Sequence, residues 1–476
     1  MTLFDTPHAV HSVATSANLL ADMRLDAFLG SFFENPEKYL TCSPETIRQR
    51  NKICAALLDR ERLQAALEAF YHAAAPMRQG GRHADTDPIR LMSSIMSVRR
   101  FYDAALALVQ AINGAIGLPA AFGAVAAELE VLLKEEYPAN FDMAWQAFAA
   151  GVETPGSAAY QISFSEDLRL TDIALTAIQK ESYGERTLLS RLSKASNPML
   201  LDSMLALTPG AYDERSLRHA GAKFTDIATQ LRFAKTTNDM LTAQSAIFMG
   251  QIAALERRVM GKIGGLLGEL PFVLGLYRCA KALGGAFAQV ARMEKRAMTI
   301  TDMVHPALPN AVPTSVPAGG DIMLLGGANQ SGKTTFLRTL GAVQILFQLG
   351  LPVPAAYAEI SPASGIFALF PREEDEALNE GKLGCELKAL GGVMAVLDEH
   401  SLFLGNEPIT GTSPAENLLL SREALCILKA KGARGVWVSH LTDIFSDAKK
   451  LNDMPFGSRY VVMAAKVVDG RFLVEG

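Results

Sequence analysis

The sequence has few cysteines and no cysteine pair of the metal-binding type. Its five cysteines are Cys42, Cys54, Cys279, Cys385 and Cys426 in 476 residues, and its eight histidines do not cluster. An odd, widely spaced set argues against both a disulfide framework and a zinc site. We therefore expect reduced, structural cysteines in a cytosolic protein.

An excess of one charge sign is also lacking. The formal net charge is −5 at pH 7, and the isoelectric point is near 6.0. The chain is therefore not strongly basic, as many nucleic-acid binders are, although a basic stripe on one face is compatible with this total. At 49% hydrophobic residues, global disorder is excluded, and the length allows about two to four domains.

No secretory signal is expected, because residues 1–20 are polar and mixed. One run without charge, residues 104–127, has the length of a membrane span. It contains Gln110 and Pro119 and is richer in alanine than in leucine, so its hydropathy is weak for a span. We expect two buried helices joined at residues 117–119, and no membrane association.

Residues with high helix propensity dominate the first 300 positions, which predicts an almost entirely helical region. Ser43, followed by Pro44 at the first helical position, predicts a helix that begins there and runs through Arg60. Further helical stretches are expected at 91–137, 166–208 and 214–300. The last of these is long and carries apolar residues at roughly helical spacing, which suits a lever or a coiled arm.

The character of the sequence changes near residue 300. Four prolines fall within residues 306–317, and strand-like runs then alternate with helical segments. The expected strands are 322–325, 365–370, 401–404 and 435–439. This alternation predicts an α/β domain with a largely parallel sheet. The final runs, 460–466 and 471–474, predict a hairpin that turns at Asp469-Gly470.

A complete phosphate-loop motif lies between an expected strand and an expected helix. Gly327-Ala328-Asn329-Gln330-Ser331-Gly332-Lys333-Thr334 fits G-x-x-x-x-G-K-[ST]. Glycines let backbone N–H groups surround phosphates, and the N-terminus of the following helix faces the negative charge. Lys333 would reach the β- and γ-phosphates and Thr334 would ligate Mg²⁺, so we expect ATP and Mg²⁺ as ligands.

An apolar run over residues 401–405 ends in Asn406-Glu407. A phosphate loop needs a second strand whose end delivers polar groups to the metal and to the attacking water. Glu407 is the candidate that orients and activates this water, and Asn406 stands where support for Mg²⁺ is expected. Such a run is weak support by itself, and it gains weight from the loop at 327–334.

Taken together, these motifs resemble those of the MutS family of DNA mismatch repair ATPases. The loop looks like the family's loop, including Asn329, and continues with Thr335. Residues 407–413 resemble the motif that follows the family's second strand, and Ser439-His440 looks like its histidine motif, which senses the γ-phosphate.

The resemblance extends upstream over nearly the whole chain. Residues 305–308 are similar to the family's entry into its ATPase domain, and residues 22–25 with 43–50 look like its helical core domain. The implied fold is multidomain, with an all-α region followed by an α/β P-loop NTPase domain of the ABC type. The implied domains are a helical core at 1–115, helical lever or clamp arms at 116–300, and the P-loop ATPase domain at 301–476.

The resemblance also implies roles for single residues. ATP would be bound by Gly327, Ala328, Asn329, Gln330, Ser331, Gly332, Lys333, Thr334 and Thr335. Thr334 and Asn406 would be metal ligands, and Glu407 and His440 would be catalytic. Thr412 and Ser413 would contact the nucleotide of a partner subunit, which implies a cytoplasmic homodimer. The arms would hold DNA by its shape or its backbone.

The chain departs from the family's pattern at three places. Asn406 replaces the usual aspartate, and Ser364 stands where the family often has an aspartate. The signature helix keeps Glu386 but lacks its serine, with Gly381 or Lys382 in that place. A neutral amide at position 406 removes one charge near Mg²⁺, so we expect lower metal affinity and slower turnover.

Two functions therefore stay open. In the first, ATP binding and hydrolysis at composite dimer sites are coupled to DNA binding through the arms. In the second, the chain is a regulatory module that binds ATP and dimerises, with little hydrolysis and no DNA binding, as Asn406 and the lost serine favour. In both, residues 411–413 and Glu386 have no evident role within one subunit and are expected to meet the partner's nucleotide.

One short match is set aside. Phe32-Phe33-Glu34 fits the letters of the Phe-x-Glu wedge of mismatch-recognising members. The family carries that wedge on a separate N-terminal domain, and short motifs without their context arise by chance. We expect these residues to be a helix end in the core domain, and we expect no preference for mismatched DNA.

Overall fold

The computed structural model describes residues 1–4, 12–78, 88–136, 157–164, 170–179, 227–316, 322–328, 331–371, 381–468 and 471–475. The chain divides into two compact units. The first contains Met1, Ala66–Gly114 and Ala124–Leu267. The second contains Thr2–Ala65, Ala115–Gly123 and Gly268–Gly476. The three consecutive domains expected from the sequence stay a prediction.

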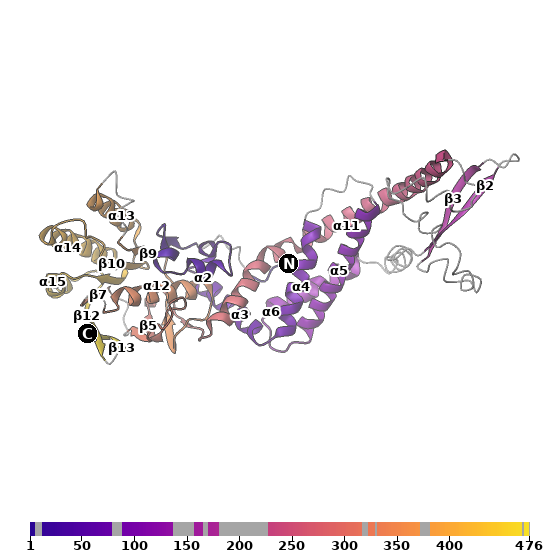
Figure 1. Ribbon diagram of the computed structural model, residues 1–476. Helices are drawn as coiled ribbons and strands as arrows, with labels where there is room; N and C mark the ends of the chain where they lie inside the picture. Colours follow the sequence, from indigo (N-terminus) through magenta and orange to yellow (C-terminus); the bar gives the residue numbers. More distant parts are fainter. Residues whose placement is uncertain are drawn as a thin grey trace. The chain divides into compact units, whose positions relative to one another are not determined.

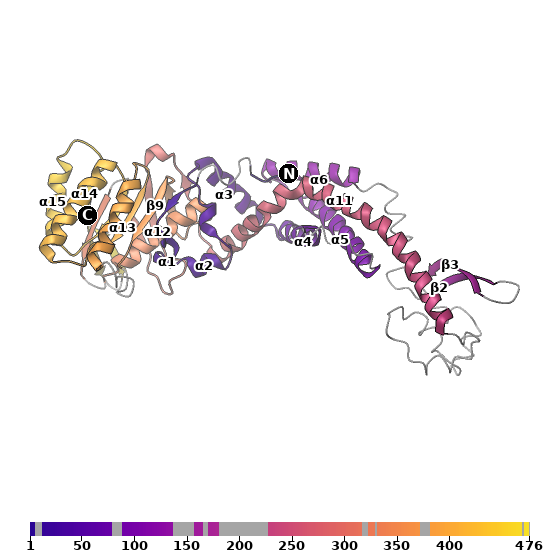
Figure 2. The ribbon, with the colours of Figure 1, turned by 90° about the horizontal axis from the view of Figure 1, so that it is seen from above.

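The first unit is built mainly from helices that lie side by side in both views (Figures 1 and 2). They are α4 (Glu61–Arg78), α5 (Pro88–Asn113), α6 (Ala120–Glu136) and the first part of α11 (Ile227–Leu283). The rings of Phe70 and Phe101 pack 5.4 Å apart between α4 and α5. Lys262 of α11 forms an ion pair with Glu135 of α6 at 2.8 Å.

The uncharged run over residues 104–127 is divided between two helices, as expected. α5 ends at Asn113 and α6 begins at Ala120, and Leu108 and Phe122 are buried on either side. In the part of the chain that the structure describes, one helical stretch, Ile252–Leu283, is long and apolar enough to cross a membrane. That test uses length and composition only, and 61% of the stretch's most apolar window is buried, as in a core helix of a soluble protein.

The expectation of helix over residues 166–208 is wrong where the structure describes this stretch. Strands β2 (Ser157–Phe164) and β3 (Leu170–Gln179) pair as an antiparallel hairpin, so the region before residue 300 is not all-α. β3 carries the β-branched residues Thr171, Ile173, Thr176 and Ile178. Such side chains lose χ1 freedom in a helix and pack well on a pleated sheet. Residues 180–208 lie outside the described residues.

The second unit is organised around a seven-stranded sheet. Its strands, in spatial order, are β1 (Ala14–Thr15), β9 (Gly365–Leu369), β10 (Leu402–Asn406), β11 (Arg434–Val438), β7 (Ile322–Gly327), β12 (Tyr460–Val468) and β13 (Arg471–Glu475). All neighbours are parallel except β12 and β13, which form the expected hairpin. The four central strands and the parallel arrangement are therefore confirmed. β1 is an addition from the N-terminal segment.

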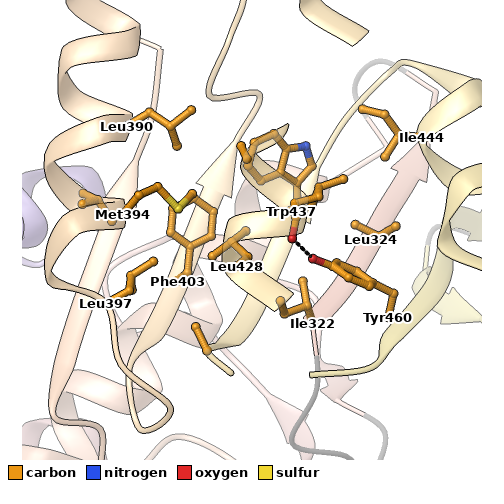
Figure 3. Packing of buried hydrophobic residues seen from close by; sticks show 14 of the residues in the cluster. Ile322, Leu324, Leu390, Met394, Leu397, Phe403, Leu428, Trp437, Ile444 and Tyr460 are labelled. Atoms are coloured by element: carbon orange, nitrogen blue, oxygen red, sulfur yellow. Dashed lines mark hydrogen bonds between the residues drawn. The ribbon is translucent and has the colours of Figure 1, made fainter. Parts of the chain in front are cut away.

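Helices cover both faces of the large sheet, and this explains why β10 and β11 are buried at every position. α12 (Lys333–Leu349) packs on one face, where Gly341 approaches Leu404 of β10. α13 (Lys382–Val396), α14 (Pro414–Lys431) and α15 (Thr442–Asn452) cover the other. There they enclose an apolar core in which the rings of Phe403 and Trp437 stack at 5.9 Å (Figure 3).

The rest of the second unit consists of a small sheet and N-terminal helices. The small sheet has the order β4 (Gln289–Val290), β8 (Tyr357–Ile360), β5 (Met298–Met303) and β6 (Thr314–Val316). The helices are α1 (Leu19–Asp22), α2 (Asp26–Gly30), α3 (Pro44–Leu58) and the one-turn helices Pro36–Tyr39 and Met293–Lys295. The Ser43 side chain accepts a hydrogen bond from the Thr46 N–H, so the predicted N-cap of α3 is confirmed.

Phe33 belongs to the core of the second unit. Only 5% of its surface is exposed, and its ring lies 6.5 Å from Tyr39 and 5.7 Å from Phe272. A buried ring in contact with two other aromatic rings contributes to packing. Phe33 also lies just after α2, which ends at Gly30, so the expected position near a helix end is confirmed, while the assignment to a separate core domain stays a prediction.

Candidate active site

The carboxyl ends of three neighbouring strands bring the sequence motifs together. Leu325 of β7 is in register with Val438 of β11, which is in register with Asn406 of β10. The Ser439 N–H donates to the Leu325 carbonyl, and the Glu407 N–H donates to the Val438 carbonyl, both at 3.2 Å. The glycine-rich loop, the Asn406-Glu407 pair and the Ser439-His440 pair thus follow adjacent strands. In parallel α/β sheets this edge is where ligands bind.

The glycine-rich loop after β7 needs glycine at defined positions. Gly327 and Gly332 have φ angles of +142° and +87°, which other residues rarely adopt. A Cβ at Gly327 would also lie 2.7 Å from the Ala465 carbonyl oxygen of β12. Thr335 is exposed on the first turn of α12. Asn329 and Gln330 lie outside the described residues.

Lys333 begins α12 and turns back over the loop. Its ammonium donates to the carbonyl oxygens of Gly327 at 2.9 Å and Ala328 at 2.7 Å. Burial lowers the pKa of Lys333, and the negative charge of Glu407 opposes this change. The structure therefore brings the lysine of the loop and the carboxylate after β10 within electrostatic reach of each other.

The Ser331 hydroxyl is buried and has no hydrogen-bond partner. An unpaired buried hydroxyl is unfavourable unless a ligand satisfies it. It lies in a loop that combines glycines, a lysine and the N-terminus of a 17-residue helix, which are the groups that recognise phosphate oxygens. The residues present therefore fit the phosphates of a nucleotide.

Thr334 and Asn406 form a polar pair between α12 and β10. The Thr334 hydroxyl donates to the Asn406 side-chain oxygen at 3.2 Å, and Asn406 is buried. Mg²⁺ prefers oxygen ligands and usually takes only one or two from the protein when phosphates supply others. Over the described residues no group of three or more His, Cys, Asp or Glu side chains could hold a metal by itself. The pair therefore fits Mg²⁺ held together with phosphates.

Glu407 and His440 contact each other at the same edge. His440 Nε2 lies 2.7 Å from Glu407 Oε1, and the two side chains are 40% and 32% exposed. Glu407 adopts a φ of +49°, in the left-handed region. Non-glycine residues in this region are uncommon and often occur at functional sites. This backbone, with the Glu407 N–H held by β11, fixes where the carboxylate stands.

Thr412, Ser413 and Glu386 differ from expectation, because each has hydrogen bonds within the chain. Ser413 accepts from the Glu416 N–H and caps α14, while the Thr412 hydroxyl donates to the Glu416 carboxylate. The Glu386 carboxylate accepts from the Thr410 N–H at 2.8 Å, the Thr410 hydroxyl at 2.6 Å and the Gly411 N–H at 2.9 Å.

These residues therefore do have roles within one subunit, while their expected contact with a partner's nucleotide stays a prediction. Glu386 fastens α13 to the loop that leaves the Asn406-Glu407 edge, and sequence reasoning missed this bond. A glutamate that accepts from the backbone N–H groups of Thr410 and Gly411, 24 and 25 positions away, leaves no pattern in the sequence. The only available signal was that the helix keeps its glutamate while it loses its serine.

Ser364 has a structural partner at the opposite, amino-terminal end of the sheet. It donates to Asp398 at 2.6 Å, and Asp398 also accepts from the Ser401 hydroxyl at 2.8 Å and the His400 N–H at 2.9 Å. Burial acts to raise the pKa of Asp398, but these hydrogen bonds outweigh it, and the pKa lies below its ordinary value. Ser364 is therefore far along β9 from the candidate site.

Comparison with known proteins agrees with this geometry. Residues 323–470 match the family model described as MutS domain V. The chain is 31% identical over 187 residues to endonuclease MutS2 of Exiguobacterium sibiricum, covering 38% of this chain and 23% of that protein. It is 30% identical over 179 residues to DNA mismatch repair protein MutS of Methanothrix thermoacetophila, covering 36% and 20%.

A third relative extends the same result. The chain is 32% identical over 142 residues to endonuclease MutS2 of Thermus thermophilus, covering 29% of this chain and 19% of that protein. The matches thus span about a fifth of the length of these curated relatives. The match to the family model, residues 323–470, covers most strands of the large sheet and the candidate site. Over residues 323–470 the chain therefore matches MutS domain V, and it is similar to MutS and MutS2 proteins.

Proposed function

We propose that the chain binds ATP with Mg²⁺ at the carboxyl edge of the large sheet and hydrolyses it. The observation that carries this proposal is that Lys333, Glu407 and His440 follow three adjacent strand ends, with Glu407 in contact with His440 and within electrostatic reach of Lys333. Binding needs donors aimed at phosphates, and hydrolysis needs a carboxylate held where water attacks. The site contains both kinds of group.

The residues would act as follows. The Lys333 ammonium and the Ser331 hydroxyl donate to phosphate oxygens and stabilise their charge. Glu407 accepts a hydrogen bond from the attacking water and orients it toward the γ-phosphorus. His440 donates to Glu407 and so holds the carboxylate in place, or it donates to the γ-phosphate. Thr334 and Asn406 would hold Mg²⁺, which neutralises charge on the β- and γ-phosphates when bound.

The finer proposal is a cytoplasmic homodimer that couples ATP to DNA. All five cysteines are free, which fits a reducing compartment. In the family that this chain resembles, the segment around Thr412 and Ser413 meets the nucleotide of a partner subunit. Both residues lie in a loop that is fastened next to Glu407 by Glu386. DNA would be held by the arms expected within residues 116–300, which contain the β2–β3 hairpin as well as helices, through its backbone or shape.

A second candidate function is a regulatory module that binds ATP and dimerises with little hydrolysis. Asn406 supplies a neutral oxygen to the metal position, where a carboxylate would supply charge. Gly381 precedes α13 with no capping side chain, and Gly381 or Lys382 stands where the family has its serine. Both differences should slow hydrolysis, and neither changes a residue that would bind the phosphates.

Two measurements separate these functions. Isothermal titration with ATP should show binding by the wild-type protein and none by Lys333→Ala, because the lysine charge faces the phosphates. Phosphate release with and without DNA then distinguishes an ATPase stimulated by DNA from a regulatory module. Equal ATP affinity of the two proteins would sink the site assignment.

The oligomeric state gives a further test. A non-hydrolysable ATP analogue should shift the protein toward a dimer in light scattering, because a composite site closes only when nucleotide is present. A monomer under every nucleotide condition would count against the composite site.

Matched and mismatched duplexes should compete equally for the protein, with affinity falling steeply as salt rises.

A further inference from the structure

The phosphate-loop helix α12 is held at its far end by a buried arginine. A helix leaves its last carbonyl groups without partners inside the helix. The Gly350 N–H donates to the Phe347 carbonyl and the Leu351 N–H to the Leu346 carbonyl, both at 3.0 Å. The other two, on Gln348 and Leu349, accept from Arg50 Nη1 at 3.4 Å, and the Gln348 carbonyl also accepts from the Thr41 N–H at 3.3 Å. Arg50 of α3 thus completes the cap, and its positive charge favours the negative end of the helix dipole.

Arg50 is almost completely buried, with 1% of its surface exposed. It donates to the Tyr39 carbonyl at 2.5 Å as well, and no carboxylate among the described residues pairs with it. Burial lowers its pKa to about 9. A buried charge is unfavourable unless hydrogen bonds stabilise it, and for Arg50 these bonds go to the carbonyl groups of Tyr39, Gln348 and Leu349. Replacing Arg50 would remove its hydrogen bonds to all three segments at once.

One of those contacts is with α11. The guanidinium carbon lies 4.8 Å from the centre of the Phe272 ring, and that ring stacks on Tyr39 at 4.1 Å. Phe272 belongs to the part of α11 that lies in the second unit. Gly350 approaches so closely that an added Cβ would stand 2.4 Å from the Arg50 Cβ. The arginine therefore joins the end of α12 to α11 with little free space.

We propose that Arg50 is a positioning residue that fixes α12, and with it Lys333 and Thr334, relative to α11. The inference rests on the proposed function, because it assigns Arg50 an effect on ATP binding at that site. α12 has 17 residues, so Arg50 acts over roughly 25 Å. A helix this well buried moves as a rigid body, and a shift at its last turn displaces its first turn, which carries the phosphate-binding groups.

The chain offers a matched control in Arg434. It is also 1% exposed and also has an unpaired Nε atom. It donates to the carbonyls of Ala297, Ser361 and Pro362, and burial lowers its pKa to about 10. None of these acceptors belongs to α12 or α11, although the Ser361 carbonyl also accepts from Gln344 of α12 at 3.3 Å. Because this shared carbonyl lies beside the middle of α12 and does not cap its end, loss of Arg434 should destabilise the fold to a similar degree with a much smaller effect on the phosphate loop.

The experiment compares full-length wild type with Arg50→Met, Arg50→Lys, Arg434→Met and Lys333→Ala. Urea unfolding measures stability, titration with ATP measures affinity, and phosphate release measures KM and kcat. We expect Arg50→Met to weaken ATP binding and raise KM by about tenfold, with kcat at saturating ATP nearly unchanged. Arg50→Lys, which keeps the charge without the planar fork, should recover part of the affinity. Arg434→Met should lose stability and keep nearly wild-type affinity.

Hydrogen exchange supplies a second readout. Adding a non-hydrolysable ATP analogue should slow exchange in residues 268–283 of α11 in wild type and not in Arg50→Met. Equal ATP affinity in wild type and Arg50→Met, or an equal loss in Arg50→Met and Arg434→Met, would overturn the inference and leave the proposed function standing. A wild-type protein that binds no ATP would overturn both.

Discussion

The two ends of the large sheet carry similar polar side chains in different bonding states. At the amino-terminal end, Asp398 accepts three hydrogen bonds, from Ser364, Ser401 and the His400 N–H. At the carboxyl end, the Glu407 side chain contacts His440, and the Ser331 hydroxyl has no hydrogen-bond partner among the described residues. At the amino-terminal end the Asp398 carboxylate is satisfied by the protein itself, although the buried Nδ1 atom of His400 is unpaired. The carboxyl end leaves a carboxylate, a lysine and a hydroxyl together for a ligand.

This difference separates stability from activity. A hydrogen-bonded polar cluster stabilises a fold, whereas an unpaired buried group destabilises it by about 1–3 kcal/mol. An unpaired buried group such as the Ser331 hydroxyl points to a ligand when it also lies among other phosphate-binding groups, as it does in the glycine-rich loop. Changes at the carboxyl end should alter ATP chemistry with little effect on unfolding, and changes at the amino-terminal end should do the reverse.

The largest effect is expected for Glu407→Gln. The amide keeps the size of the side chain but cannot accept a proton or hold the attacking water as a carboxylate does. Hydrolysis should fall by about 100-fold while ATP affinity is retained. Single-turnover phosphate release and titration with ATP measure the two quantities. Wild-type turnover in this variant would place the catalytic residue elsewhere.

Asp398→Ala should act on stability alone. It removes the shared acceptor of two hydroxyl groups and one N–H, and the site is partly open to water, so we expect a loss of about 1 kcal/mol in the free energy of unfolding. Urea unfolding measures this change. Phosphate release should stay at the wild-type rate, and a strong loss of turnover at full folding would break the distinction between the two ends.

Asn406→Asp should strengthen Mg²⁺ binding at the carboxyl end of the sheet, with a smaller effect than the two changes above. A carboxylate keeps an acceptor for the Thr334 hydroxyl and adds a negative charge beside the metal position. The Mg²⁺ concentration that gives half-maximal turnover should fall by a few-fold. Asn406→Ala, which lacks the oxygen, is the control and should need more Mg²⁺ than wild type. The same Mg²⁺ dependence in all three proteins would remove residue 406 from the metal site.

The sequence predicts the central strands well, because each is a continuous apolar run bounded by turn residues. β7, β9, β10 and β11 all begin and end within two residues of their expected bounds. The motifs at their ends follow, since the carboxyl ends of parallel strands meet at one edge. The site residues that the sequence singles out thus depend on local patterns alone.

Other elements depend on distant partners and give no such pattern. β1 has two residues and exists only because β9 lies beside it. The β2–β3 hairpin combines alanine and leucine with threonine and isoleucine, so its composition favours helix and strand almost equally. Arg50 reads as one more charged residue on α3, and its burial follows from contacts with residues 348–349, almost 300 positions away.

His305 lies outside both ends of the large sheet and should make the stability of the protein depend on pH. Only 2% of its surface is exposed. Its Nε2 atom lies 2.8 Å from the Met23 carbonyl, and its Nδ1 atom accepts from the Ala307 N–H. This arrangement fits a neutral ring, because a second proton on Nδ1 would face the Ala307 N–H. Burial lowers the pKa of His305, and although the bond to Met23 opposes this, the charges of Arg338 and Arg24 add to it.

The smallest predicted effect is a loss of stability in mild acid that depends on His305. Its folded pKa is depressed, so its contribution is complete above the unfolded value of about 6.5 and is lost as the pH falls through the folded pKa. One proton changes the free energy of unfolding by at most about 1.4 kcal/mol per pH unit. Urea midpoints at pH 7.5 and 5.5 should therefore differ less in His305→Gln than in wild type, even though the variant is less stable at pH 7.5. An equal difference in both proteins would show that other groups carry the acid sensitivity and that the ring accepts its second proton in the fold.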